Sequence, residues 1–341
     1  MVFAILFSQP FRTNMSQSKS MNFTQQLAFK AQGTNKNEFE CLHPPNRAGN
    51  TANIAYGGYA LATAAKAACL SVPPTYHLYS MLGDYLGPAL SDRPLCANVR
   101  TIRQTRTFAT RLVEISQTHD NGKDRTCLIC TIDFQTVEPA SLLEYSQPPS
   151  MHYTHYSTLA PRAQVFQKLR DDGKITQAML DEQQRQFGIF DNIFNFRPCP
   201  EGSFAQNLYG IAKTLPTTQD HLPITSRTTA DWVCSYETLE SAADQVAYLA
   251  FLMDGGLVFA PLAFSNMWFD DISANSSLDF ALRVFGGVDM GKWGLRETKT
   301  REASKGRTFG EAWLWDEGGR AVACMSQMGI LRPAKGRELK L

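Results

Sequence analysis

Hydrophobic and polar residues follow two patterns in the first half of the chain, one continuous and one alternating. Residues 59–72 form the continuous run, in which alanine fills positions 60, 62, 64, 65, 67 and 68. Alanine has the highest helix propensity, and Pro73-Pro74 ends the run because proline cannot continue a helix. The run therefore predicts a helix with small side chains, around which a curved sheet can wrap closely.

The segments after this helix show the pattern of strands. They are rich in Thr, Val, Ile, Phe and Tyr and are separated by turn residues. Asp120-Asn121-Gly122 is a hairpin turn, because Asn and Gly tolerate a positive φ. The pattern predicts one helix and an antiparallel meander, with strands at 76–86, 95–104, 107–118 and 125–136.

The second half repeats this arrangement. Strand-like segments at 189–197 and 229–236 precede an amphipathic helix at about 239–253. The tripeptide Arg-Thr-Phe begins the long hairpin of each half, at 106–108 and at 307–309. Two helix-plus-meander units in tandem indicate a duplicated α+β fold. Further strands are expected near 258–269, 277–285, 293–302, 306–315 and 320–330.

The chain between and outside the two units has a different character. Residues 1–40 are polar and rich in Ser, Gln, Asn and Thr, which predicts a flexible arm. The stretch 139–161 is rich in Pro, Ser and Tyr, and 162–187 is polar with a helical pattern, so we interpret the connection as a surface linker carrying a helix. The predicted organisation is an arm at 1–40, an N-terminal unit at 41–137, a linker at 138–188, a C-terminal unit at 189–333 and a tail at 334–341.

Composition and charge narrow the classes of partner. The 341 residues are 43% hydrophobic and 19% charged, which suits a globular protein with a substantial core. Lys and Arg number 33 against 32 Asp and Glu, so the net charge of +1 favours neither a nucleic acid nor an anionic membrane as partner. The eight cysteines lack the spacing of a secreted scaffold, which predicts reduced thiols in the cytoplasm.

Both chain ends carry a feature that bears on localisation. Residues 1–7 are apolar but too few for a membrane span, and no basic region of a signal peptide accompanies them. The last four residues, Glu-Leu-Lys-Leu at 338–341, approximate the peroxisomal address Ser-Lys-Leu. A peroxisomal location is therefore the alternative to the cytoplasm.

Motifs for several other chemistries are absent from the sequence. There is no G-x-S-x-G elbow, no phosphate-binding loop, no H-E-x-x-H and no G-x-G-x-x-G. Cys127 and Cys130 share one predicted strand, where residues three apart face opposite sides, so packing is favoured over zinc binding. His152 and His155 have no evident third ligand. We expect no metal and no cofactor, and a hydrolysis would use water directly.

Six motifs stand in order along the two halves. The first half contains NIAYGG at 53–58, YSMLGDYLGP at 79–88 and RQTRTFATR at 103–111. The second half contains LMD at 252–254, SLD at 277–279 and ACMSQMG at 323–329. Together they resemble type II acyl-CoA thioesterases, and the motifs of the first half resemble those of the fungal members most closely. The resemblance implies a double hotdog fold, in which two tandem repeats each wrap an antiparallel sheet around a long helix, and association into homodimers or larger homo-oligomers.

The resemblance also implies a catalytic trio around one water, which falls on Asp254, Ser277 and Gln327. Asp254 would accept a proton from the water, which Ser277 and Gln327 would orient, while amides near Gly57-Gly58 or that of Gln327 would stabilise the oxyanion. The residues by themselves allow plainer interpretations. Asp254 could end a helix, Ser277 could be an ordinary strand residue, and Gln327 a buried amide that needs a partner. Gly57-Gly58 could serve tight packing.

The sequence departs from the family pattern at polar positions. The two histidines of the first half are Tyr79 and Leu82 here, and Phe280 and Met328 stand where the family has His and Glu. The side chains of Phe280, Met328, Tyr59 and Met81 would suit a fatty or polyketide-like chain, although core packing explains them equally well. The expected substrate-binding residues are Gly57, Gly58, Tyr59, Met81, Phe280 and Met328.

Three functions are consistent with these residues. The first is hydrolysis of a thioester of CoA or of an acyl carrier. The second is a specialised double-hotdog hydrolase, dehydratase or isomerase of secondary metabolism, and the third is a non-catalytic acyl-binding protein. His77 is the only histidine near the motif strands of the first half, which argues against a dehydratase.

Overall fold

The computed structural model describes residues 21–30, 37–50 and 52–334. The apolar run at 1–7 and the C-terminal Glu-Leu-Lys-Leu lie outside the described residues.

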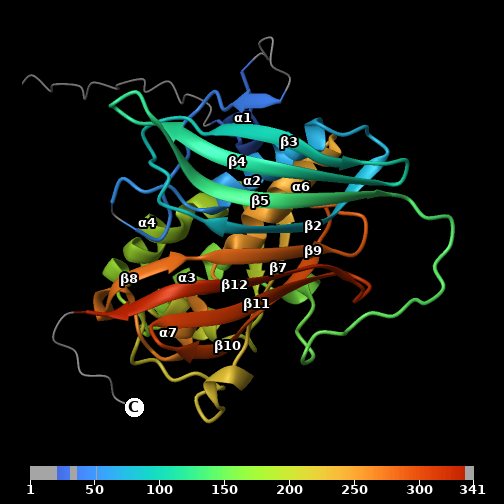
Figure 1. Ribbon diagram of the computed structural model, residues 1–341. Coiled ribbons are helices and arrows are strands. Elements are labelled where there is room, and N and C mark those ends of the chain that lie inside the picture. Colours follow the sequence, from blue (N-terminus) through green and yellow to red (C-terminus); the bar gives the residue numbers. More distant parts are fainter. Residues whose placement is uncertain (1–20, 31–36, 51, 335–341) are drawn as a thin grey trace, which may run out of the picture.

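One antiparallel sheet runs through both halves of the molecule (Figure 1). Its order is β1-β3-β4-β5-β2-β9-β12-β11-β10-β7-β6, and β8 also pairs with β12. The halves join where β2 pairs with β9, in a register that sets Ser80 opposite Arg283 and Asp84 opposite Asp279. The strands are β1 (Glu38–Glu40), β2 (Tyr76–Tyr85), β3 (Cys96–Gln104), β4 (Phe108–Thr118), β5 (Asp124–Thr136), β6 (Phe194–Pro198), β7 (Thr229–Ser235), β8 (Ile272–Ser277), β9 (Asp279–Val284), β10 (Gly294–Ser304), β11 (Arg307–Asp316) and β12 (Ala321–Pro333).

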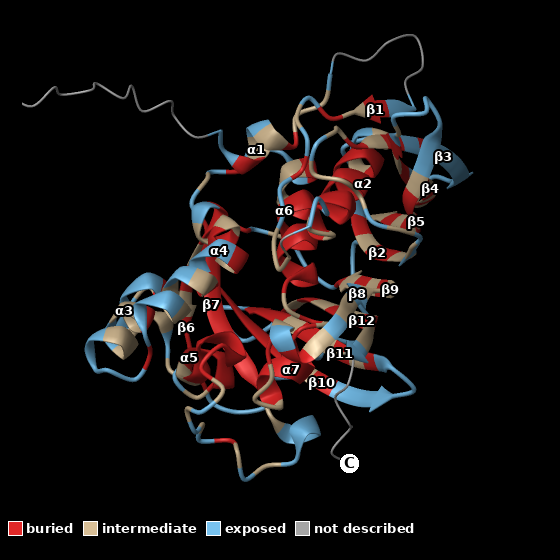
Figure 2. Cartoon of the chain, turned by 90° about the vertical axis from the view of Figure 1, so that its left-hand side faces the viewer, coloured by how far each residue is buried: buried red, intermediate tan, exposed pale blue. Residues whose placement is uncertain are grey.

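Two helices occupy the inside of this sheet. They are α2 (Gly58–Leu70) and α6 (Ala242–Asp254), which pack against each other and are buried along most of their length (Figure 2). An ion pair, 2.7 Å between Lys66 Nζ and Asp244 Oδ1, links the C-terminal part of α2 to the start of α6. The helices are therefore antiparallel. The alanines of α2 allow the two helices to pack closely. Two halves that share one sheet, each with its own central helix, confirm the double hotdog fold class.

Shorter helices lie outside this pair. The α-helices are α1 (Phe23–Gln26), α3 (Arg162–Asp171), α4 (Gln177–Ile193), α5 (Ser203–Asn207) and α7 (Ala260–Phe264). The 3-10 helices are η1 (Tyr156–Thr158), η2 (Leu208–Gly210), η3 (Ile224–Ser226) and η4 (Phe269–Asp271).

Two predicted strands differ from the structure. Residues 258–269 contain α7 because Pro261 suits the first turn of a helix and removes a donor that a strand needs. A short apolar run does not distinguish a buried strand from a buried helix, and α7 is buried throughout. Residues 189–193 are the last residues of α4, where the ring of Phe190 packs 5.1 Å from the ring of Tyr56. The strand β6 therefore begins only at Phe194.

Part of the predicted flexible arm is packed. Phe23 and Leu27 are each 2% exposed and Phe39 is 4% exposed. The Phe23 ring lies 4.4 Å from that of Phe251 in α6, so α1 covers part of the central helices. The prediction of a loose arm is wrong for these residues because a few apolar side chains in a polar segment suffice to anchor it.

The segment after β5 crosses back over the C-terminal part of the sheet (Figure 1). Tyr153 donates a hydrogen bond of 2.6 Å to the buried Glu297, and Trp315 Nε1 donates one of 2.7 Å to the Gln147 carbonyl. These contacts attach the linker to the face of the sheet that α2 and α6 do not cover.

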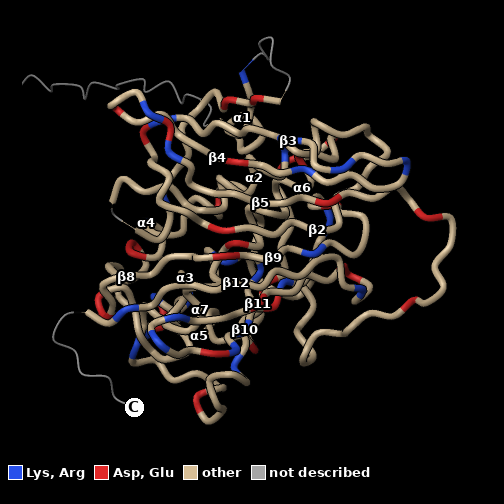
Figure 3. The backbone as a smooth tube through the Cα atoms, viewed as in Figure 1, with Lys and Arg blue, Asp and Glu red and all other residues tan. Residues whose placement is uncertain are grey.

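Charged residues of both signs are interspersed along the chain (Figure 3). None of the helices in the described part of the chain is long and apolar enough to cross a bilayer.

Candidate active site

The side chains of Asp254 and Gln327 meet in the interior. Asp254 is the last residue of α6 and Gln327 lies in β12; they are 5% and 1% exposed. Gln327 Nε2 donates a hydrogen bond of 2.8 Å to Asp254 Oδ1. Two residues 73 positions apart thus form one buried polar pair.

The turn after α6 brings this pair together. The helix ends at Asp254, and Gly256 follows with φ +93°, a conformation that favours glycine. The chain then crosses β12 at Gly329, where a Cβ would lie 2.4 Å from Val258 Cγ1. Only glycine at 329 permits this approach, which holds Asp254 over the strand that carries Gln327.

The N-terminal half supplies further donors to the same carboxylate. The Tyr85 hydroxyl donates to Asp254 Oδ1 at 3.0 Å. The Tyr56 hydroxyl, which donates to the Phe251 carbonyl at 2.9 Å, and the Gly58 N–H lie close enough to the carboxylate to lower its pKa. A Cβ on Gly57 would lie 3.3 Å from Asp254 Oδ2. The carboxylate therefore faces the N-terminus of α2, where the helix dipole stabilises negative charge.

Burial and hydrogen bonding act on this carboxyl in opposite directions. Burial raises the pKa of Asp254, and the polar groups of Gln327, Tyr85, Tyr56 and Gly58 beside it lower it; the net pKa lies above the ordinary value of 3.8. Burial, followed by the nearby negative charge of Asp254, raises the pKa of Tyr56 and Tyr85 well above 10.0. Both phenols therefore stay protonated and act as donors.

Arg296 of β10 fixes the last turn of α6. Its Nη1 donates to the carbonyls of Leu252, at 2.8 Å, and Gly255, at 3.3 Å. Its Nη2 lies 3.2 Å from Asp231 Oδ2, and both side chains are buried. A cation at this position stabilises the C-terminal end of the helix dipole, immediately beside Asp254.

One acceptor at the site has no partner. Gln327 Oε1 is buried without a hydrogen bond among the described residues. The amide orientation follows from its neighbour, because an ionised carboxylate accepts hydrogen bonds only and must face Nε2. The buried oxygen Oε1 is therefore available to a water molecule or a ligand.

Family models match both halves of the chain. The Acyl-CoA thioesterase N-terminal domain matches residues 44–135, and the Acyl-CoA thioesterase C-terminal domain matches residues 184–331. The chain belongs to the acyl-CoA thioesterase family. A search of curated protein sequences gave no match.

Solved structures of this thioesterase type share the fold. An acyl-CoA thioesterase II, TesB2, from Mycobacterium marinum is 18% identical, covers 92% of this chain and 99% of its own, and has a TM-score of 0.64. A tesB protein from Mycobacterium avium subsp. paratuberculosis is 14% identical over 91% and 98% of the two chains, with a TM-score of 0.62. A hot dog fold protein of unknown function from Alicyclobacillus acidocaldarius is 15% identical over 92% and 98%, also with a TM-score of 0.62.

The third residue of the trio predicted from the thioesterase resemblance, Ser277, ends β8. It pairs with Gly329 of β12 and is partly buried. Paired residues of neighbouring strands share a face, and so do residues two apart in one strand, so Ser277 lies on the same face as Gln327. Among the described residues, its hydroxyl makes no hydrogen bond to Asp254 or Gln327.

The predicted substrate-binding side chains fall in different places. Phe280 is 3% exposed and its ring lies 5.7 Å from that of Tyr85, beside the site. Met81 is fully buried in the core, and the Tyr59 hydroxyl donates to Gln26 of the α1 helix at 2.9 Å. Met328 does not reach the site, because successive residues of a strand point to opposite faces and Gln327 faces the helices.

Tyr56, Tyr85 and Arg296 were not among the predicted site residues. Tyr56 and Tyr85 stand inside the quoted motifs, but the sequence could not show that their hydroxyls reach α6 from the other half. Alternation along β2 would have placed Tyr85 on the same face as Gly83 and Met81. Nothing in the sequence pointed to Arg296.

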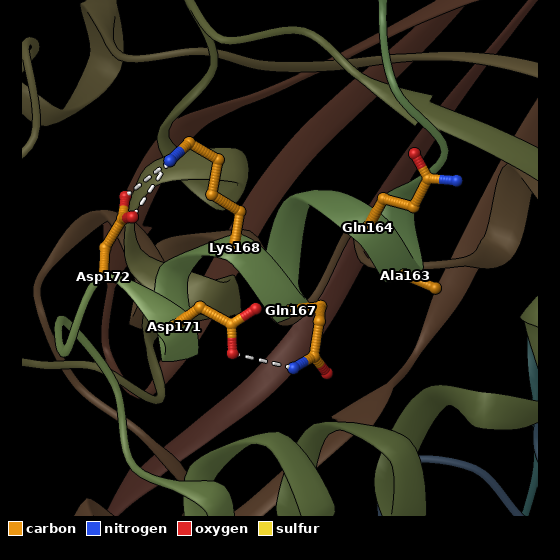
Figure 4. A pocket seen from close by; sticks show the side chains of 6 residues that line it. All are labelled: Ala163, Gln164, Gln167, Lys168, Asp171 and Asp172. Atoms are coloured by element: carbon orange, nitrogen blue, oxygen red, sulfur yellow. Dashed lines mark hydrogen bonds and ion pairs between the residues drawn. The ribbon is translucent and has the colours of Figure 1, made fainter.

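Two surface depressions lie away from this pair. One, of about 520 Å³, is lined by the polar side chains of α3, including Lys168, Asp171 and Asp172 (Figure 4). The other, of about 420 Å³, lies between Phe23, Asn46 and Ile193. No group of three or more His, Cys, Asp or Glu side chains in the described part of the chain is arranged to hold a metal ion.

Proposed function

We propose that the protein hydrolyses an acyl-CoA thioester with a water molecule activated by Asp254. The observation that carries the proposal is the buried Asp254–Gln327 pair, in which Gln327 Oε1 remains an unpaired acceptor. The membership in the acyl-CoA thioesterase family supports the substrate class.

The pair suits the task of orienting a nucleophilic water. A water that donates one hydrogen to Asp254 and the other to Gln327 Oε1 keeps a lone pair for attack on the thioester carbonyl carbon. Ser277, on the same face, would orient the water or the carbonyl once a substrate is present. Because Asp254 has a raised pKa, it accepts a proton more readily than an exposed aspartate does.

The reaction then balances without an enzyme-bound intermediate. Asp254 takes one proton as the oxygen of the water bonds to the carbonyl carbon, which gives a tetrahedral oxyanion. The C–S bond breaks as the oxyanion collapses, and the CoA sulfur leaves with the proton from Asp254. The N-terminal end of α2, beside Gly57 and Gly58, would stabilise the oxyanion through the positive end of its helix dipole.

Release of free thiol from short, medium and long acyl-CoAs tests the proposal with wild type and Asp254→Asn. We expect saturable hydrolysis by wild type and a loss of about 10²–10⁴-fold in kcat for the variant, the range for a general base. Asp84→Asn is the matched control, because Asp84 is exposed on β2. Full activity in Asp254→Asn would refute the role of Asp254, and no hydrolysis of any ester by wild type would refute the thioesterase proposal.

The other functions expected from the sequence have less support. His77 is exposed on β2, so no histidine of that strand accompanies Asp254 as a dehydratase would require. If the protein binds acyl-CoA without hydrolysing it, non-catalytic acyl binding replaces the thioesterase proposal. The acyl chain, the homo-oligomeric state, the domain boundaries and the cytoplasmic or peroxisomal location stay predictions.

A further inference from the structure

Tyr85 is the one residue of the sheet in the N-terminal half whose side chain contacts Asp254 in the described structure. It is the last residue of β2, at the seam where the two halves join. Its hydroxyl donates 3.0 Å to Asp254 Oδ1, the oxygen that also accepts from Gln327 at 2.8 Å. We propose that Tyr85 is a positioning residue, which fixes the Asp254 carboxylate from the opposite half of the molecule; this inference rests on the proposed function.

The surroundings of Tyr85 leave its ring little freedom. Its backbone N–H donates to the Leu278 carbonyl at 2.8 Å, and its ring meets that of Phe280 edge-on at 5.7 Å. A Cβ on Gly57 would lie 3.1 Å from both the ring and the hydroxyl of Tyr85. Contacts on these sides hold the hydroxyl at Asp254 Oδ1.

Two hydrogen-bond donors on Oδ1 hold the Asp254 carboxylate in one rotamer. Gln327 reaches it from β12 and Tyr85 from β2, while Gly57 borders Oδ2. A carboxylate held from both halves cannot rotate away from the Gln327 amide without losing the bond to Tyr85. The position of the base therefore depends on the correct docking of the two repeats.

Other charged or titratable groups lie near Asp254 or behind its neighbours. Tyr56 comes from the segment before α2, and Arg296 from β10 holds the last turn of α6. Asp231 of β7 lies behind Arg296, and Arg162 of α3 acts electrostatically on Asp231. None of these is altered by the change Tyr85→Phe, which removes a single hydroxyl and keeps the ring.

Tyr85→Phe is the test. The loss of a donor to the charged form raises the pKa of Asp254, so the acidic limb of kcat/KM shifts upward by about one pH unit. We expect kcat to fall about tenfold with KM unchanged, because Tyr85 positions the base and does not bind substrate. Tyr79→Phe is the matched control, since Tyr79 lies at the bulge of the same strand, its ring packs against Phe108, and its hydroxyl makes no hydrogen bond to another described residue.

A carboxyl titration by 13C NMR gives a readout that does not need activity. The Asp254 signal, assigned by its absence in Asp254→Asn, should titrate at higher pH in Tyr85→Phe than in wild type and Tyr79→Phe. An unchanged titration, or a rise in KM at constant kcat, would overturn the positioning role. If wild type hydrolyses no acyl-CoA, the proposed function fails and the titration still decides on Tyr85. Thermal unfolding confirms that each variant is folded.

Discussion

Replacing Arg296 by Met tests whether this buried arginine holds the end of α6. The variant keeps an aliphatic side chain of similar length but loses the bonds to the Leu252 and Gly255 carbonyls. It also leaves Asp231, which is 3% exposed, without its nearest partner. Removal of one member of a buried ion pair typically costs about 3–5 kcal/mol. We expect the lower end, about 3 kcal/mol, because Arg162 still acts electrostatically on Asp231.

Thermal unfolding measures this loss. A destabilisation of about 3 kcal/mol lowers Tm by roughly 4 °C in a chain of this size. Arg301→Met is the matched control on the same strand, because its ion pair with Glu311 is half-exposed and contributes less than about 1 kcal/mol.

A second substitution separates the cost of leaving the Asp231 carboxylate unpaired from the cost of the packing lost at Arg296. Asp231→Asn in the Arg296→Met background removes the unpaired carboxylate, so the double variant should be more stable than Arg296→Met alone. If Arg296→Met unfolds at the wild-type Tm, or if the double variant is less stable than the single one, the buried pair does not anchor α6.

Two further predictions concern the polar pair itself. Since the pKa of Asp254 is raised, wild-type kcat/KM should fall with decreasing pH around a midpoint above 3.8. For the same reason, Asp254 contributes to the free energy of unfolding below its unfolded pKa, and this contribution is lost as the pH rises through its folded pKa. Unfolding midpoints between pH 3 and pH 7 should therefore differ in slope between wild type and Asp254→Asn, and parallel curves would contradict the raised pKa. Gln327→Leu removes a donor to Asp254 Oδ1 and the free acceptor Oε1, so kcat should fall about 10²-fold and the acidic limb should move upward. A change in KM alone would show that Gln327 contacts the substrate instead of the water.

Local sequence signals were sufficient to predict the helices and strands that the two halves repeat. The alanine run and Pro73-Pro74 set the length of α2, since propensity and proline act within one or two turns of a helix. Alternating residues and the turn at Gly122, whose φ is +74°, placed β4 and β5. The same signals failed for α7, because a short apolar run that is buried on all sides has no period.

Some residues of the candidate site could be predicted from the sequence. Asp254, Ser277 and Gln327 were predicted from the resemblance, and so was Met328 as a substrate-binding residue, although alternation along β12 places Met328 on the opposite face from Gln327. Phe23 and Phe39, in a polar segment, gave no signal of the core that they join.

The two repeats, their central helices and most of their strands could be predicted from local patterns, because those depend on neighbours a few residues apart. The donors around Asp254 became visible only in the folded molecule. Tyr85 lies 169 residues from Asp254 and Gln327 lies 73 residues from it, and Arg296 fixes the carbonyl of Leu252, 44 residues away. Contacts over such separations depend on how the two halves dock through the β2–β9 seam and the α2–α6 packing, and no local pattern encodes that docking.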